Sequence, residues 1–200
     1  MTRRSKTGDF AVRRESSIVL GVLLTSLLIV PALARAQDPT ARFGEVVPRD
    51  VREMYDRGLQ FLASTQTPSG EWTGGMEGGP GGTGLGLMVF LASGEDPNFG
   101  LYSNHIRRAL RSIIGSQDPS TGFLGQSMYH HGFGMLALAE AYGTVDDRTL
   151  WTSGDPAGLA GVGKERQRSI GQALELAVRA AITSQKKNPF GAWRYSPDAN

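Results

Sequence analysis

Three copies of one short motif constrain the fold of this chain more than any other feature. Each copy begins with a glutamine, continues through a turn to a glycine, and ends on an aromatic residue. The copies are Gln66, Gly70 and Trp72; Gln117, Gly122 and Phe123; and Gln185, Gly191 and Trp193. A motif that recurs in this way predicts one supersecondary unit that is repeated along the chain and stacks on its neighbours.

Helical patterns surround each copy of the motif. Apolar residues at helical spacing predict an amphipathic helix before each glutamine, over about 51–65, 106–114 and 170–182. After the first two copies, the segments 83–93 and 128–142 are apolar on nearly all sides, which predicts helices buried on all sides. Glycine-rich residues 67–83 are expected to form a loop, and Gly143 is a plausible helix stop.

These patterns predict an all-α fold of helical hairpins, each with an outer amphipathic helix and an inner apolar one. No segment alternates with the period of a β-strand for long. Residues 51–200 hold about two and a half hairpins, and a polar stretch at about 144–165 is expected to be an inserted surface loop. Within that loop, Trp151 is expected to fold the insertion back onto the repeats.

Structural roles account for the motif itself. The glutamine at the end of each outer helix can donate to carbonyl groups that lack a partner there. The glycine permits a positive φ, and the aromatic ring can cover the seam between hairpins. On the second outer helix, Arg107, Arg108 and Arg111 are expected on the polar face.

The N-terminal segment 1–36 is typical of a secretory signal. A basic region ends at Arg14, an apolar run follows from Ile18 to Leu33, and Ala34-Arg35-Ala36 matches a cleavage site with small residues. We therefore expect export to the periplasm, the cell envelope or the outside of the cell. The alternative is an uncleaved N-terminal helix that anchors the chain in a membrane. Residues 37–50 are expected to form a linker.

Charge and composition exclude several classes of function. The 1–36 segment holds six of the 21 basic residues and two of the 19 acidic ones, so the rest of the chain is slightly acidic. With no basic stripe interleaved with aromatic residues, nucleic-acid binding is not expected. The chain has no cysteine, which excludes thiolate metal sites and a cysteine nucleophile.

The spacing of Gln66, Gly70 and Trp72 resembles the glutamine–tryptophan motif of squalene and hopene cyclases. The alternation of outer and inner helices is similar to the α/α-toroid superfamily of terpenoid cyclases and protein prenyltransferases. Residues 128–143 resemble the inner-helix segment of bacterial exported prenyltransferase and squalene oxidase repeat proteins. The resemblance implies a ring of about six hairpins around a central funnel, of which this chain supplies an N-terminal fragment.

The acid chemistry of that superfamily is not found in this chain. Its cyclases protonate their substrate with an Asp-x-Asp-Asp motif, and the nearest match, Asp146-Asp147, lacks the first aspartate and lies in the insertion. We interpret these two residues as loop or capping residues. Glu140 is either a buried acid or, as we favour, a residue that faces the polar edge of the next hairpin. The zinc site of protein prenyltransferases needs a cysteine, and because this chain has none, that site does not carry over.

Tyr129, His130 and His131 are the candidate cavity-lining residues, because they begin an inner helix that the resemblance places at the funnel. The alternative is a role in packing or capping. Neighbouring helical residues point about 100° apart, so the two histidines are not expected to share a metal. We predict neither a metal nor a cofactor, and the catalytic residues, if any, are not identified.

The sequence favours a non-catalytic exported repeat protein that binds a small apolar ligand or a protein partner. One alternative is a cyclase-like enzyme that acts on isoprenoids with an acid motif beyond residue 200. Another is a purely structural module of the cell envelope.

Overall fold

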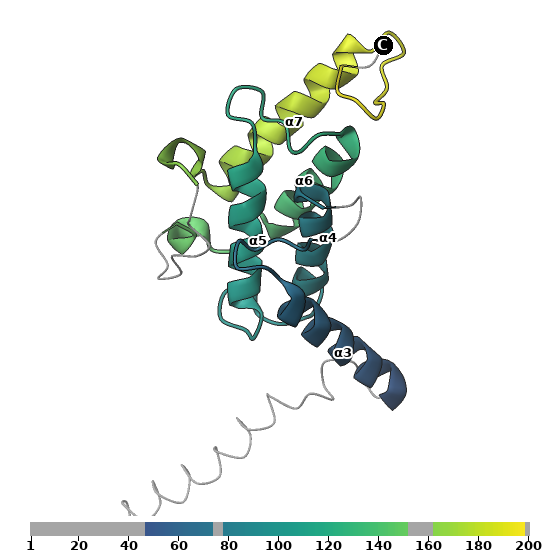
Figure 1. The fold of residues 1–200 in the computed structure, drawn as a ribbon, viewed down its shortest axis with the longest axis vertical. Helices are drawn as coiled ribbons and strands as arrows, with labels where there is room; N and C mark the ends of the chain where they lie inside the picture. The colour runs from purple at the N-terminus through teal and green to yellow at the C-terminus, as the bar shows by residue number, and fades with distance from the viewer. Residues whose placement is uncertain (1–46, 74–77, 152–161, 199–200) are drawn as a thin grey trace, which may run out of the picture. The chain divides into compact units, whose positions relative to one another are not determined.

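The computed structural model describes residues 47–73, 78–151 and 162–198 (Figure 1). Their regular structure is helical, and the single β-contact among them is an isolated bridge between Gln117 and Leu124. The all-α prediction is therefore confirmed for these residues. The elements are α3 (Arg49–Thr65), α4 (Pro80–Leu91), α5 (Ser103–Ser116), α6 (Met128–Ala141), η3 (Asp147–Thr149), η5 (Lys164–Arg166) and α7 (Ile170–Lys187).

The chain divides into two units, Met1–Arg52 and Glu53–Asn200. In the first unit only the residues from 47 onward are described, so the predicted export segment 1–36 and most of the predicted linker 37–50 lie outside the described residues. Within the described ranges, no helix combines the length and the hydropathy that crossing a membrane requires.

In the second unit, the two apolar helices form a pair. α4 and α6 pack against each other, α5 packs on α4, α7 packs on α6, and α5 also contacts α7 (Figure 1). The core lies between these helices, with its largest share of aliphatic side chains from α5 and further ones from α6 and α7. The predicted order of amphipathic and apolar helices thus has a direct counterpart in the packing.

α4 begins earlier than its composition predicts. Residues up to 83 were expected to form a loop, but the helix starts at Pro80, which suits the first helical position because it needs no N–H partner there. The glycines that follow permit close contact with α6. A Cβ atom on Gly84 would stand 2.7 Å from the carbonyl oxygen of Phe133, and one on Gly81 would crowd His130. Packing against α6 therefore decides the helical state of this segment.

The insertion is more than a surface loop. Leu150 is fully buried, and the indole Nε1 of Trp151 donates to the carbonyl oxygen of Arg168 at 2.7 Å, as expected for a loop folded back on the repeats. The expectation for Arg111 was wrong, since this side chain is also buried and donates to the carbonyl oxygen of Leu150 at 3.3 Å. The insertion covers the polar face of α5 at this position and supplies a partner for the guanidinium group. Residues 152–161 of the insertion lie outside the described residues.

Candidate functional site

The glutamine of the motif joins one hairpin to the next outer helix. In the first copy, Gln66 Nε2 donates to the carbonyl oxygens of Gly70 at 3.1 Å and His105 at 3.0 Å. In the second copy, Gln117 Nε2 donates to the carbonyl oxygens of Gly122 and Ala173, both at 2.9 Å. The sequence predicted instead a bond to the end of the glutamine's own helix. The real acceptors lie on the loop and on the following outer helix.

The motif glycine makes the close contact between hairpins. Gly70 and Gly122 have φ angles of 93° and 78°, as predicted, and both are buried. A Cβ atom on Gly122 would stand 2.5 Å from the carbonyl oxygen of Leu176, and one on Gly70 would overlap with that of Arg108. Only glycine therefore satisfies both the backbone angle and the approach of the next helix.

The motif tryptophan stays within its own hairpin. Trp72 Nε1 donates to the carbonyl oxygen of Leu62 at 2.9 Å, and Trp193 Nε1 donates to that of Ala181 at 2.8 Å. Both acceptors lie four residues before the motif glutamine. The second copy has Phe123 in this place, and its ring stacks on the imidazole of His131 with centroids 4.6 Å apart.

His131 is a buried link between the second loop and α7. Its Nδ1 accepts the N–H of Leu124 at 3.0 Å, so Nε2 carries the proton and donates to the carbonyl oxygen of Ala177 at 3.0 Å. Burial disfavours the charged imidazolium and lowers the pKa of His131 below its ordinary value. These contacts correspond to the packing alternative for this residue.

The other two candidate residues differ in accessibility. The backbone N–H of His130 is capped by Ser127 Oγ at 3.3 Å, and its ring lies against Gly81 and Gly125. Its buried Nδ1 has no hydrogen-bond partner among the described residues. Tyr129 is half exposed and meets the ring of Phe133 edge to face. Of the three predicted cavity-lining residues, Tyr129 is therefore the one most open to a ligand.

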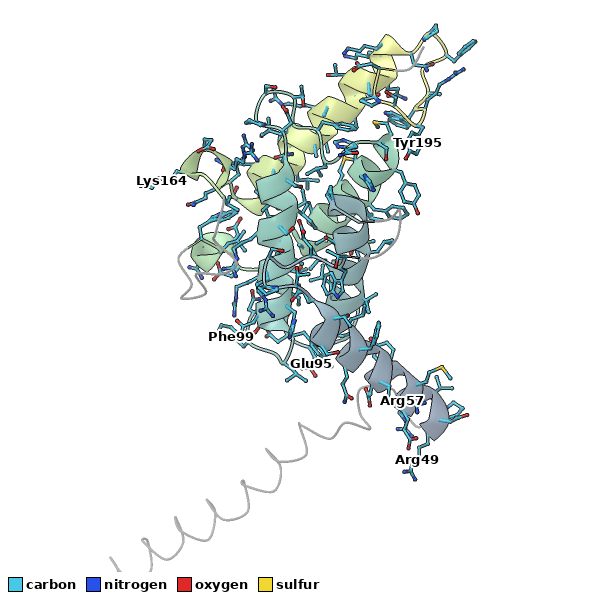
Figure 2. The ribbon with its side chains drawn as sticks, viewed as in Figure 1. Arg49, Arg57, Glu95, Phe99, Lys164 and Tyr195 are labelled. Carbon is cyan, nitrogen blue, oxygen red and sulfur yellow. The ribbon has the colours of Figure 1, made fainter. Side chains whose placement is uncertain are left out.

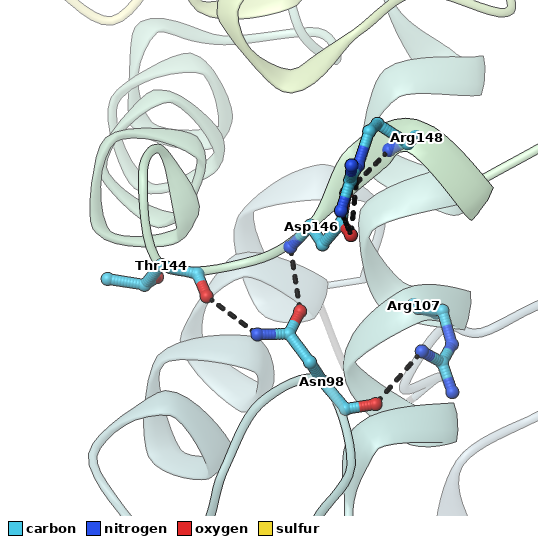
Figure 3. Close-up of polar contacts among 5 residues, drawn as sticks. All are labelled: Asn98, Arg107, Thr144, Asp146 and Arg148. Carbon is cyan, nitrogen blue, oxygen red and sulfur yellow. Dashed lines mark hydrogen bonds and ion pairs between the residues drawn. The ribbon is translucent and has the colours of Figure 1, made fainter.

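The aspartates of the insertion hold loops together. Asp146 caps η3 and pairs with Arg148 at 2.7 Å, and hydrogen bonds from Arg148 lower the pKa of Asp146 to about 2. Asp147 accepts the backbone N–H of Ile170 at 2.9 Å. In Figure 3, Asn98 clamps this loop by donating to the carbonyl oxygen of Thr144 at 3.0 Å and accepting the N–H of Asp146 at 2.7 Å. The observed contacts are those of loop and capping residues.

A pocket of about 390 Å³ lies at the C-terminal ends of α4 and α6. Glu140 is exposed at this pocket, and it is the one carboxylate in the lining. Within the described ranges, no group of three or more His, Asp or Glu residues could hold a metal ion. The remaining lining residues are Met88, Leu91, Ala92, Pro97 and Thr144.

Beside this pocket, α4 and α6 expose apolar side chains. We call Leu85, Val89, Tyr129 and Leu136 the α4/α6 face; their exposed fractions lie between 39% and 46%. On each helix they lie on the side away from the buried residues that meet α5 and α7. The prediction that both helices are buried on all sides was wrong here, because the outer helices cover only one side of the pair.

No family model, no curated protein and no solved structure matches the chain.

Proposed function

We propose that this chain is an exported repeat protein of α/α-toroid architecture that binds a small apolar ligand on its α4/α6 face without transforming it. The observation that carries the proposal is the exposure of this face. The two most apolar helices of the described chain leave Leu85, Val89, Tyr129 and Leu136 open to solvent. Contiguous exposed apolar surface on a folded protein is commonly a binding surface.

The toroid is supported by the order and packing of the helices. Amphipathic α5 and α7 pack on the outside of the apolar pair α4 and α6, and the motif spacing resembles that of the superfamily. In a toroid, the α4/α6 face would line the interior. The pocket at its end would then open into the same space.

The absence of catalysis is supported by how the candidate groups are used. Both ring nitrogens of His131 are hydrogen-bonded to backbone groups, and the two aspartates of the insertion accept backbone N–H groups of loop and helix-end residues. Glu140 is the one carboxylate in the pocket lining, whereas the acid motif of the cyclases is a cluster of neighbouring carboxylates.

Photoaffinity labelling of the full chain tests the ligand proposal. With a benzophenone ether of farnesol as the probe, we expect labelled peptides from 80–91 and 128–141. Replacing Leu85 or Leu136 by Gln should reduce labelling about tenfold, because burying a leucine contributes about 1.5–3 kcal/mol. Phe99→Gln is the matched control, since Phe99 is more exposed and lies outside this face. Equal labelling of all three variants would contradict the proposal.

Two further measurements separate the alternatives. Incubation with squalene should return squalene unchanged, and cyclised products would establish the enzyme instead. N-terminal sequencing of the chain from expressing cells should begin after Ala36. An intact N-terminus in the membrane fraction would support the anchor.

A further inference from the structure

The α4/α6 face leads into the pocket at the C-terminal ends of its two helices. On α6, Glu140 of the pocket follows Leu136 by four residues and Tyr129 by eleven, a spacing that keeps all three on one side of the helix. At about 1.5 Å per residue, this stretch of α6 is about 16 Å long. An elongated ligand can therefore lie along the face with one end beside Glu140.

α4 connects the face to the pocket in the same way. Met88 of the pocket lining lies three residues after Leu85 of the face. Ala92, which also lines the pocket, lies three residues after Val89 of the face. Residues three apart on a helix are surface neighbours, so the lining continues the face along α4 as well. All four of these side chains are apolar and suit an apolar chain.

The pocket offers negative charge. Glu140 is the one charged side chain in its lining, and the carboxylate has no hydrogen bond or ion pair among the described residues. α4 and α6 both end at the pocket, and the last carbonyl groups of a helix carry a partial negative charge. These partial charges add to the charge of the carboxylate, so the pocket favours a cation.

The neighbouring loops do not offset this negative charge. The loop of residues 92–101 contains two acidic residues and neither lysine nor arginine. Figure 2 shows Glu95 and Phe99 of this loop where α4 ends and α5 begins. In the loop after α6, Arg148 pairs with Asp146 at 2.7 Å and is not part of the pocket lining. A cation in the pocket therefore meets no basic side chain in the lining.

Hydrogen bonds between the two loops fix the shape of the pocket. Asn98 donates to the carbonyl oxygen of Thr144 at 3.0 Å, which joins the loop after α4 to the loop after α6 (Figure 3). Thr144 Oγ1 in turn donates to the carbonyl oxygen of Glu140 at 2.9 Å. Pro97 and Thr144, which line the pocket from the two loops, are thereby held relative to each other. A preformed site loses less conformational entropy when it binds a ligand.

We propose that the ligand of the α4/α6 face is an amphiphile with one apolar chain and a protonated primary amine, and that the ammonium group binds in the pocket beside Glu140. The three N–H donors of a primary ammonium suit a carboxylate together with helix-end carbonyl groups. The volume of about 390 Å³ accommodates this head group, and Met88, Leu91 and Pro97 contact the first part of the chain. This inference rests on the proposed function, because the chain lies on the α4/α6 face.

The charges of the pocket favour a single-chain amine over the amine of a phospholipid. A phosphoethanolamine head group carries a phosphate close to its amine. The pocket lining has no lysine or arginine to bind that phosphate, and the carboxylate of Glu140 repels it.

Competition against the benzophenone ether of farnesol tests the head group on the full 200-residue chain. Farnesylamine, farnesol and farnesoate share one apolar chain and differ in the group at its end. We expect farnesylamine to halve the labelling of 80–91 and 128–141 at about a fivefold lower concentration than farnesol, because an exposed ion pair and a helix end each contribute modestly. Farnesoate should need the highest concentration. Equal competition by all three would overturn this inference and leave the proposed function standing, whereas no competition by any of them would contradict both.

Substitutions at Glu140 assign the preference to the pocket. Glu140→Gln should abolish the preference for farnesylamine over farnesol, and Glu140→Lys should make farnesoate the best competitor. Glu175→Gln is the matched control, since it removes an exposed carboxylate of α7 outside this pocket, and it should keep the preference of the parent chain. Thermal unfolding should be close to that of the parent for all three variants. A folded Glu140→Gln form that still prefers farnesylamine about fivefold would overturn the inference.

Salt and a lipid provide two further readouts. Sodium chloride at about 1 M screens charges, so it should reduce the preference for farnesylamine, and an unchanged preference would contradict a charge-based site. Dihexanoyl phosphatidylethanolamine represents the lipid head group and should compete less well than farnesylamine. Stronger competition by this lipid would overturn the choice of a single-chain amine.

Discussion

The second and third motifs share their local chemistry but differ in their surroundings. Leu110 and Ile114 of α5 are fully buried, whereas Val178 and Ile182, at the same register on α7, are 40% and 42% exposed. The bond from glutamine to the loop glycine is present in both copies. The comparison separates interactions that form within a hairpin from those that need a neighbouring hairpin.

The largest expected difference is between two glycine substitutions. Gly122→Ala should destabilise the fold by about 4 kcal/mol, because it combines an unfavourable backbone angle with overlap of the α7 backbone. Gly191→Ala introduces the same unfavourable backbone angle but no overlap, so it should lower the free energy of unfolding by about 1 kcal/mol. The free energy of unfolding in urea, measured at low protein concentration, compares the two. Equal losses would mean that the close approach to Leu176 contributes nothing.

The second-largest difference in unfolding free energy is expected between substitutions of two motif glutamines. Gln117 is fully buried, and Gln117→Ala leaves the carbonyl groups of Gly122 and Ala173 without this donor, which should cost about 2–3 kcal/mol. Gln185→Ala removes one solvent-accessible bond and should cost about 0.5 kcal/mol. Urea unfolding of both variants provides the measurement. A loss for Gln185→Ala as large as that for Gln117→Ala would show that the third copy is already complete.

Acid should weaken the second motif through His131. Its pKa in the folded state is lowered below the ordinary value of 6.5, so the unfolded state binds more protons as the pH falls. Stability from this group is complete above about pH 6.5 and declines below it by at most about 1.4 kcal/mol per pH unit. Protonation also removes the acceptor for Leu124.

His131→Asn is the reference variant for this prediction. It should be less stable at pH 7, yet its unfolding free energy should change less between pH 7 and pH 5. Some pH dependence should remain, because burial and the charge of Arg108 also lower the pKa of His105. A slope as steep as that of the parent chain would contradict the assignment to His131.

The smallest expected difference is between the two tryptophans. The indole bonds of Trp72 and Trp193 lie within their own hairpins and have nearly the same length. Trp72→Phe and Trp193→Phe should therefore each cost about 1 kcal/mol, from the loss of the N–H donor. Thermal unfolding of the two variants can test this equality. A much larger loss for Trp72 would indicate that its ring contact with Phe90 dominates.

The sequence predicted the elements that local pattern determines. The extent of α6, Met128–Ala141, agrees with the predicted 128–142, whereas α7 runs to Lys187, past the predicted end at 182. The apolar stripe of α7 stops at Ile182, so its spacing did not predict the polar residues that continue the helix. The start of α4 was missed, since Pro80 and the glycines after it are typical of a loop. Contacts with α6 hold these residues in the helix.

The sequence identified residues of the candidate site but not the partners that they contact. The motif glutamines were identified, yet their second acceptors lie 39 and 56 residues away in the sequence. Arg111 was expected on a polar face, and the path of the insertion over α5 buries it. Periodicity identifies the faces of a helix but does not say which segment covers each face.

The composition of α4 has a consequence for synthesis. The helix begins with proline and contains four glycines in twelve residues, so it has little tendency to form alone. Its partner α6 starts only at Met128 and is therefore synthesised later than α4. We therefore expect a nascent chain that ends before that residue to present 80–91 as an unfolded apolar segment, the kind of sequence that chaperones bind, and the first hairpin to mature only when the second is made.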